Sequence, residues 1–82
     1  MGQVTASQVA DYILWFAHQT GDCITNLKLQ KLVYYAQAWY LALYDKPLFD
    51  DPLEAWVHGP VQPDLYHRFK VYRYNPIAED VE

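Results

Sequence analysis

With 82 residues, 6 Lys and Arg against 10 Asp and Glu, and a net charge of -4, the chain is one small domain. Its charge argues against a nucleic-acid partner, since neutralising phosphates needs a basic face. Its single cysteine, Cys23, excludes an internal disulfide, and with neither a signal-peptide pattern nor a run of about 18 apolar residues we expect a cytoplasmic protein without a membrane span.

Aromatic residues are unusually dense, with 3 Trp, 8 Tyr and 3 Phe. A domain of this length buries only about 60% of the surface that its unfolded chain exposes, so its core depends on large side chains or on a partner. So small a core cannot enclose every ring. We therefore expect some rings at the surface, where Tyr and Trp are typical of protein interfaces.

A first helix is predicted over residues 6–19. Thr5 can cap its N-terminus, Gln8 can complete a capping box, and Gly21 fits the C-terminal stop. Residues at helical spacing predict its apolar face, which Tyr12 and Trp15 flank: Val9, Ile13, Phe16 and Ala17.

A second, longer helix is predicted over residues 26–44, with Thr25 as its N-cap and Pro47 beyond its end. Its main apolar stripe is Leu29, Leu32, Val33, Ala36, Tyr40 and Leu43, and the apolar surface is widened by Tyr34, Tyr35, Trp39 and Leu41. Consecutive side chains on a helix point about 100° apart, so these rings cannot all face one core. The sequence leaves open what the second face meets.

The remainder predicts an extended segment or short strand over residues 53–58, a turn at Gly59-Pro60, and a third helix over residues 63–72 that begins at Pro63. Residues 75–82 are acidic and are predicted to be a frayed end. The expected fold is mainly α, a small domain of three helices with a short extended segment before the Gly-Pro turn.

The residue pattern does not indicate catalysis. The cysteine and the three histidines, His18, His58 and His67, lack the tight spacings of a zinc site, and the three glycines form no phosphate-binding loop. Paired carboxylates lie beside prolines or near the last residue, where solvation is the ordinary state. We therefore expect no catalytic residues, no metal and no cofactor, and a protein-binding module in place of an enzyme.

Two ordered motifs resemble a known family. Residues 25–39, TNLKLQKLVYYAQAW, resemble the LKLQKLLYYAQGW signature of the Panacea domain, also called the SocA-like antitoxin or GepA-type domain. A second block follows at the family's distance, with PLFD at 47–50, EAWVHGPV at 54–61 and PDLY at 63–66. The resemblance extends from about Val9 to Ile77. Relatives continue beyond the position of Ile77, so residues 1–82 look like a single domain with the family's N-terminal part and without its C-terminal helical part.

The resemblance implies an antitoxin, of a family found in bacteria, archaea and phages, that neutralises a cognate protein toxin by direct binding, without catalytic activity. Presenting the toxin to a protease, as an adaptor, is an alternative mechanism. A nucleic-acid-binding regulator is the rival class, and a homo-oligomer stays open. The polar or amphipathic positions within the motifs are the predicted partner contacts: Lys28, Gln30, Lys31, Tyr34, Gln37, His58 and Tyr66. Structural roles are predicted for Leu29, Leu32, Trp56, Gly59, Pro60 and Pro63.

Overall fold

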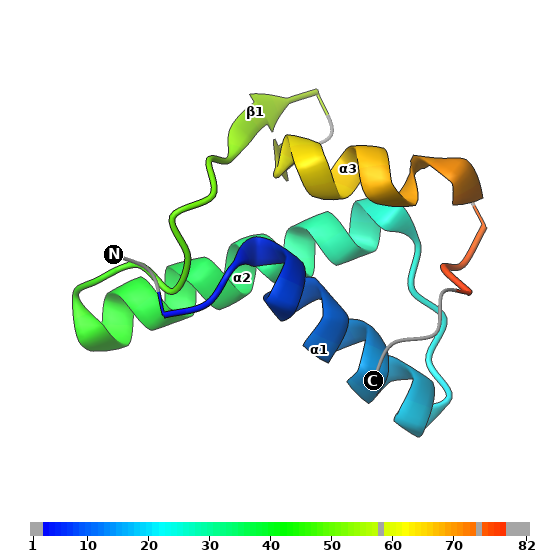
Figure 1. Cartoon of the computed structure of the whole chain (residues 1–82), viewed down its shortest axis with the longest axis horizontal. Helices are drawn as coiled ribbons and strands as arrows, with labels where there is room; N and C mark the ends of the chain where they lie inside the picture. Colours follow the sequence, from blue (N-terminus) through cyan, green and yellow to red (C-terminus); the bar gives the residue numbers. More distant parts are fainter. Residues whose placement is uncertain (1–2, 58, 74, 79–82) are drawn as a thin grey trace.

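Three α-helices, a two-stranded hairpin and a short 3-10 helix make up the part of the chain that the computed structural model describes, residues 3–57, 59–73 and 75–78 (Figure 1). The expected fold class, mainly α with a small extended element, is confirmed. Helices α1 and α2 lie across one another, and α3 packs beside the N-terminal half of α2 (Figure 1).

Helix α1 spans Ala6–Thr20 and has the predicted caps. The Thr5 hydroxyl accepts from the Gln8 backbone N–H at 3.1 Å, and the Gln8 side-chain oxygen accepts from the Thr5 N–H at 2.8 Å. Gly21 ends the helix with a φ of 77°, a left-handed conformation that glycine adopts without a steric cost. A further anchor comes from the loop after α2, because the Asp51 carboxylate accepts from the free Ala6 N–H at 3.0 Å.

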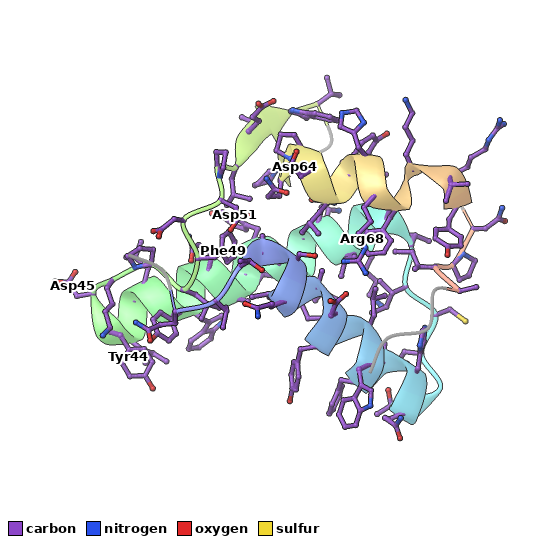
Figure 2. The ribbon with its side chains drawn as sticks, in the orientation of Figure 1. Tyr44, Asp45, Phe49, Asp51, Asp64 and Arg68 are labelled. Carbon is purple, nitrogen blue, oxygen red and sulfur yellow. The ribbon has the colours of Figure 1, made fainter. Side chains whose placement is uncertain are left out.

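Helix α2 spans Asn26–Tyr44, the predicted range. The Thr25 hydroxyl accepts from the Lys28 N–H at 3.3 Å, and Asp45, with a φ of 56°, closes the C-terminus. The loop that follows runs back along α2, and Phe49 is buried where this loop passes the start of α1 (Figure 2).

Strands β1 (Glu54–Trp56) and β2 (Gly59–Val61) pair antiparallel, with Ala55 opposite Pro60. The predicted extended segment therefore contains β1. Gly59 and Pro60, which were predicted to form a turn, are the first residues of β2. Gly59 has a φ of 118°, a backbone angle that residues other than glycine rarely adopt. Helix α3 (Pro63–Phe69) begins at Pro63 as predicted, with Gln62 as its N-cap, and continues as the 3-10 helix η1 (Lys70–Tyr72).

The core gathers side chains from both long helices, the loop and α3. Its buried apolar residues are Ala6, Val9, Ala10, Leu14, Ala17, Ile24, Leu29, Val33, Phe49, Leu65, Phe69 and Ile77. Ile77 falls in the segment predicted to fray, yet its side chain is 3% exposed and its N–H donates to the Ile24 carbonyl at 2.8 Å. Residues 79–82 of that segment lie outside the described residues.

The two predicted apolar faces are confirmed in part, with departures on each helix. Ala10 and Leu14 fill the core from α1, whereas Phe16 is 53% exposed. On α2, Leu43 was predicted in the main stripe but is 65% exposed, because the last turns of the helix extend beyond α3 (Figure 1). A buried amide, Gln30, takes a core position instead.

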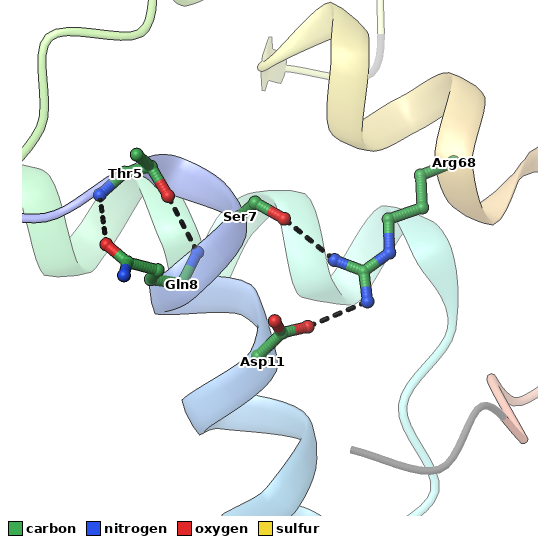
Figure 3. A network of polar contacts seen from close by, with 5 residues as sticks. All are labelled: Thr5, Ser7, Gln8, Asp11 and Arg68. Carbon is green, nitrogen blue, oxygen red and sulfur yellow. Dashed lines mark hydrogen bonds and ion pairs between the residues drawn. The ribbon is translucent and has the colours of Figure 1, made fainter. Parts of the chain in front are cut away.

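One ion pair ties α3 to α1. Arg68 donates from Nη2 to the Asp11 carboxylate at 2.7 Å and from Nη1 to the Ser7 hydroxyl at 2.9 Å (Figure 3). Its guanidinium carbon lies 4.5 Å from the centre of the Phe69 ring. Both members of the pair are partly exposed, so the contact fixes the orientation of α3 more than it adds free energy.

Candidate protein-binding surface

The polar residues of the α2 motif divide into an inward and an outward set. Gln30 belongs to the inward set, with 2% of its surface exposed. Its Nε2 donates to the Asn26 side-chain oxygen at 3.1 Å, and its Oε1 accepts from the Gln62 N–H at 2.9 Å. Asn26 in turn donates to the Tyr66 carbonyl at 3.1 Å. Burial thus gives Gln30 a structural role, because its amide joins α2 to Gln62 between β2 and α3, and the prediction of a partner contact there has no exposed surface to support it.

Gln37, two turns after Gln30 on the same face of α2, has a similar structural role. Its Nε2 donates to the Phe49 carbonyl at 2.8 Å, and its Oε1 accepts from the Leu48 and Phe49 N–H groups at 2.8 and 3.2 Å. All three groups belong to the loop after α2. Both polar atoms of the Gln37 amide are therefore engaged within the chain, and a partner contact at Gln37 stays a prediction.

The outward set consists of Lys28, Lys31 and Tyr34. Both lysines are exposed, and Tyr34 is 38% exposed with its ring centre 5.8 Å from that of Tyr35. Lys31 and Tyr34 are three residues apart on the helix and therefore share one face of it. Lys28, three residues before Lys31, lies beside it and also lines the groove described below.

Tyr66 is half-buried and packs against the hairpin. Its ring centre lies 4.9 Å from that of Trp56 in an edge-to-face arrangement, the geometry that aromatic pairs prefer. Trp56 also donates from its indole N–H to the Glu54 carboxylate at 2.9 Å. Tyr66 thus holds the hairpin on α3 while part of its ring stays at the surface. His58, the remaining predicted contact, lies outside the described residues.

A groove of about 450 Å³ runs between α1 and α2. Its walls are four exposed rings: Tyr12 (65% exposed), Phe16 (53%), Tyr35 (55%) and Trp39 (68%). Smaller apolar side chains, Ile13, Ala17, Ile24, Leu32 and Ala36, also line it. Asp22 and Lys28 are its charged lining residues. Interface centres are typically aromatic and depleted of charge, so this composition suits association.

The sequence contained a signal for this groove. Tyr12 and Phe16 are four residues apart, as are Tyr35 and Trp39, and a short link joins the two helices. Side chains four apart lie on the same helix face. The pattern could not show that the two faces adjoin, because their juxtaposition depends on how α1 crosses α2.

The described residues contain no group of three or more His, Cys, Asp or Glu side chains that could hold a metal ion. Cys23 is exposed, and in the described part of the chain no helix combines the length and apolar character needed to cross a membrane. The fold and surface therefore define a small, mainly helical domain that presents an open aromatic groove.

Comparison with known proteins gives this domain a family. Residues 29–82 match the family described as "Antitoxin SocA-like, Panacea domain", and the chain belongs to it. It is 41% identical over 66 residues to Antitoxin SocA of Caulobacter vibrioides (strain NA1000 / CB15N). That match covers 80% of this chain and 35% of the relative, so the chain spans about a third of the relative's length. No solved structure matches the chain.

Proposed function

We propose that this chain is an antitoxin module that neutralises a cognate protein toxin by binding it directly, without catalysis. Membership of an antitoxin family supports the role. The observation that carries the binding site is the division of the α2 motif. Gln30 and Gln37 are engaged within the chain, whereas Lys31 and Tyr34 project outward from the same motif.

Lys31 and Tyr34 form the proposed contact face. A lysine supplies a mobile cation for a carboxylate of the toxin, and a half-exposed tyrosine supplies an apolar ring with a polar tip. Tyr66, with its partly exposed ring, is a further proposed contact, and Lys28 extends the positive charge along α2. His58 stays a proposed contact from the sequence alone.

The test is co-expression with the protein encoded by the adjacent reading frame, read out as growth and as recovery of a complex. We expect rescue of growth by the wild-type chain. The double variant Lys31→Ala/Tyr34→Ala should lose rescue and weaken binding by about tenfold or more, as expected for loss of an interface tyrosine.

The matched control is Lys46→Ala/Tyr44→Ala, which removes the same two residue types from exposed positions at the end of α2. Both double variants should melt within about 8 °C of the wild type, because each of the two exposed substitutions changes stability by only about 0.5 kcal/mol. Equal loss of rescue by both double variants would contradict the proposed contact face. A large fall in melting temperature with unchanged affinity would make Lys31 and Tyr34 structural.

Two mechanisms are compatible with direct binding. Occlusion of the toxin's active surface leaves the amount of toxin unchanged, whereas an adaptor that delivers the toxin to a protease shortens its half-life. We favour occlusion as the simpler consequence of binding. Measuring toxin levels after translation is stopped, with and without this chain, distinguishes the two mechanisms. A toxin half-life shortened only by the wild-type chain would favour the adaptor.

A further inference from the structure

The two strands of the hairpin differ in what their outer edges offer. Ala55 lies opposite Pro60, and proline has no N–H to donate, so these residues form a non-hydrogen-bonded pair of the ladder. Main-chain groups alternate in direction along a strand. The N–H and C=O groups of Leu53, Ala55 and Val57 therefore point away from β2.

Two contacts support this phase and close the outer edge of β2. The carbonyl of Pro52, one residue before Leu53, faces the β2 side and accepts from the Gln62 side chain at 3.3 Å. The Gln62 backbone N–H donates to Gln30 on α2 at 2.9 Å, in the direction away from β1. The outer edge of β2 thus lies against α2, with no N–H on Pro60 and with that of Gln62 already engaged.

The outer edge of β1 has no such cover. Residues 54–57 are exposed, Val57 to 98%, and β1 lies at the margin of the molecule (Figure 1). In the described part of the chain, none of the backbone hydrogen bonds outside the helices and the hairpin involves Leu53, Ala55 or Val57. A row of main-chain N–H and C=O groups at an open edge is a template for a further strand. The chemistry of this edge therefore fits an extended polypeptide.

We propose that the outer edge of β1 binds an extended segment of a protein partner in which basic and apolar side chains alternate. Charge selects the basic side chains. Residues 47–66 contain four carboxylates and no Lys or Arg: Asp50, Asp51, Glu54 and Asp64. The next cation along the chain, Arg68, is paired with Asp11. Two copies of this edge would bring like charges together, so a second copy of the chain does not fit it.

The alternation follows from the two faces of β1. Glu54 and Trp56 share one face, where the indole N–H donates to the carboxylate at 2.9 Å. A Lys or Arg of the added strand would meet a carboxylate and an aromatic ring there, and both attract a cation. The other face carries Leu53, which packs partly against the core, and the exposed Ala55 and Val57. Apolar side chains of the added strand would cover this face.

The test is a titration of the full chain with two synthetic peptides of about seven residues, enough to span the edge. One peptide alternates Lys with Val, and the other alternates Glu with Val. Binding is followed by the NMR shifts of the backbone amides. We expect saturable shifts centred on residues 53–57 for the Lys peptide, with a Kd on the order of 1 mM, and at least about tenfold weaker binding of the Glu peptide.

Two variants test the edge itself. Ala55→Pro should weaken binding of the Lys peptide about tenfold, since it removes an N–H that points away from β2 and leaves the pairs of the hairpin intact. Glu54→Gln should weaken it about threefold, because it removes a charge but keeps an acceptor for the Trp56 N–H. The matched control is Asp45→Asn at the end of α2, where Asn also tolerates the left-handed backbone, and it should bind as the wild type does.

Unchanged affinity of Ala55→Pro with its hairpin intact would overturn the proposal. So would equal binding of the two peptides, or no binding of the Lys peptide at about 5 mM. Should Ala55→Pro disrupt the hairpin, the comparison of Glu54→Gln with Asp45→Asn decides, and equal affinities would overturn the proposal. No toxin enters the measurement, so its outcome is independent of the proposed function.

Discussion

Replacing Gln30 with alanine should destabilise the domain far more than its polar side chain suggests. The substitution removes two hydrogen bonds inside the fold, at 2.9 Å to the Gln62 N–H and at 3.1 Å to the Asn26 side chain. It leaves a donor on Gln62 and an acceptor on Asn26, which are 2% and 4% exposed. Each buried polar group left without a partner costs about 1–3 kcal/mol.

We therefore expect Gln30→Ala to lower the free energy of unfolding by about 2–6 kcal/mol from the two unpaired groups, with a further loss from the cavity. A domain of this length has a total stability on the order of 4–12 kcal/mol, so the loss is a large fraction. The assay is urea unfolding followed by circular dichroism. Gln19→Ala, at an exposed position in the last turn of α1, is the control and should change stability by about 0.5 kcal/mol or less.

Gln30→Glu adds a test of the same contacts through pH. Burial raises the pKa of a carboxyl at position 30 above its unfolded value of about 4.3. The neutral acid can still donate to Asn26 and accept from Gln62, whereas the carboxylate cannot donate. The stability deficit relative to the wild type should therefore be smallest below about pH 4.3 and should grow as pH rises through the folded pKa. A deficit independent of pH, or a Gln30→Ala loss below about 0.5 kcal/mol, would refute the buried network.

Three further predictions concern local structure, each measured by thermal and urea unfolding against the wild type. Thr5→Ala removes the capping box with Gln8 and should cost about 1 kcal/mol, while Thr5→Ser should keep most of that stability. Gly59→Ala should cost about 1–3 kcal/mol, because no heavy atom lies within 4 Å of the added Cβ but the φ of 118° is strained. Asp11→Ala breaks the partly exposed pair with Arg68 and should cost less than about 1 kcal/mol, a loss that shrinks in high salt.

The helix boundaries could be predicted because the signals that set them are local. Thr5 with Gln8, Thr25, and Pro63 each act within one turn of chain, and the structure places helix starts at all three. The position of Ile77 could not be predicted in the same way. It is held by the distant Ile24, so its burial depends on tertiary contacts that no local pattern encodes.

The predictions for surface residues were also correct only in part. Dense aromatic residues indicated exposed rings, and Tyr12, Tyr35 and Trp39 are exposed. The roles of Gln30 and Gln37 were missed because an amide on an otherwise apolar helix is normally a surface residue. Only the fold shows that the hairpin and the loop after α2 bring backbone N–H groups to those positions.

Helix α2 therefore buries amides beside its apolar core residues and also exposes aromatic rings. The exposed rings that line the groove lie on α1 as well as on α2, and each exposes more than half of its surface. The buried amides, by contrast, have partners within the chain, and they fix the register of α2 against the hairpin whether or not a partner is bound. Specificity of the fold and capacity for association thus come from different residues of one helix. This is why variants at Gln30 should alter stability, whereas variants at Lys31 and Tyr34 should alter binding of a partner.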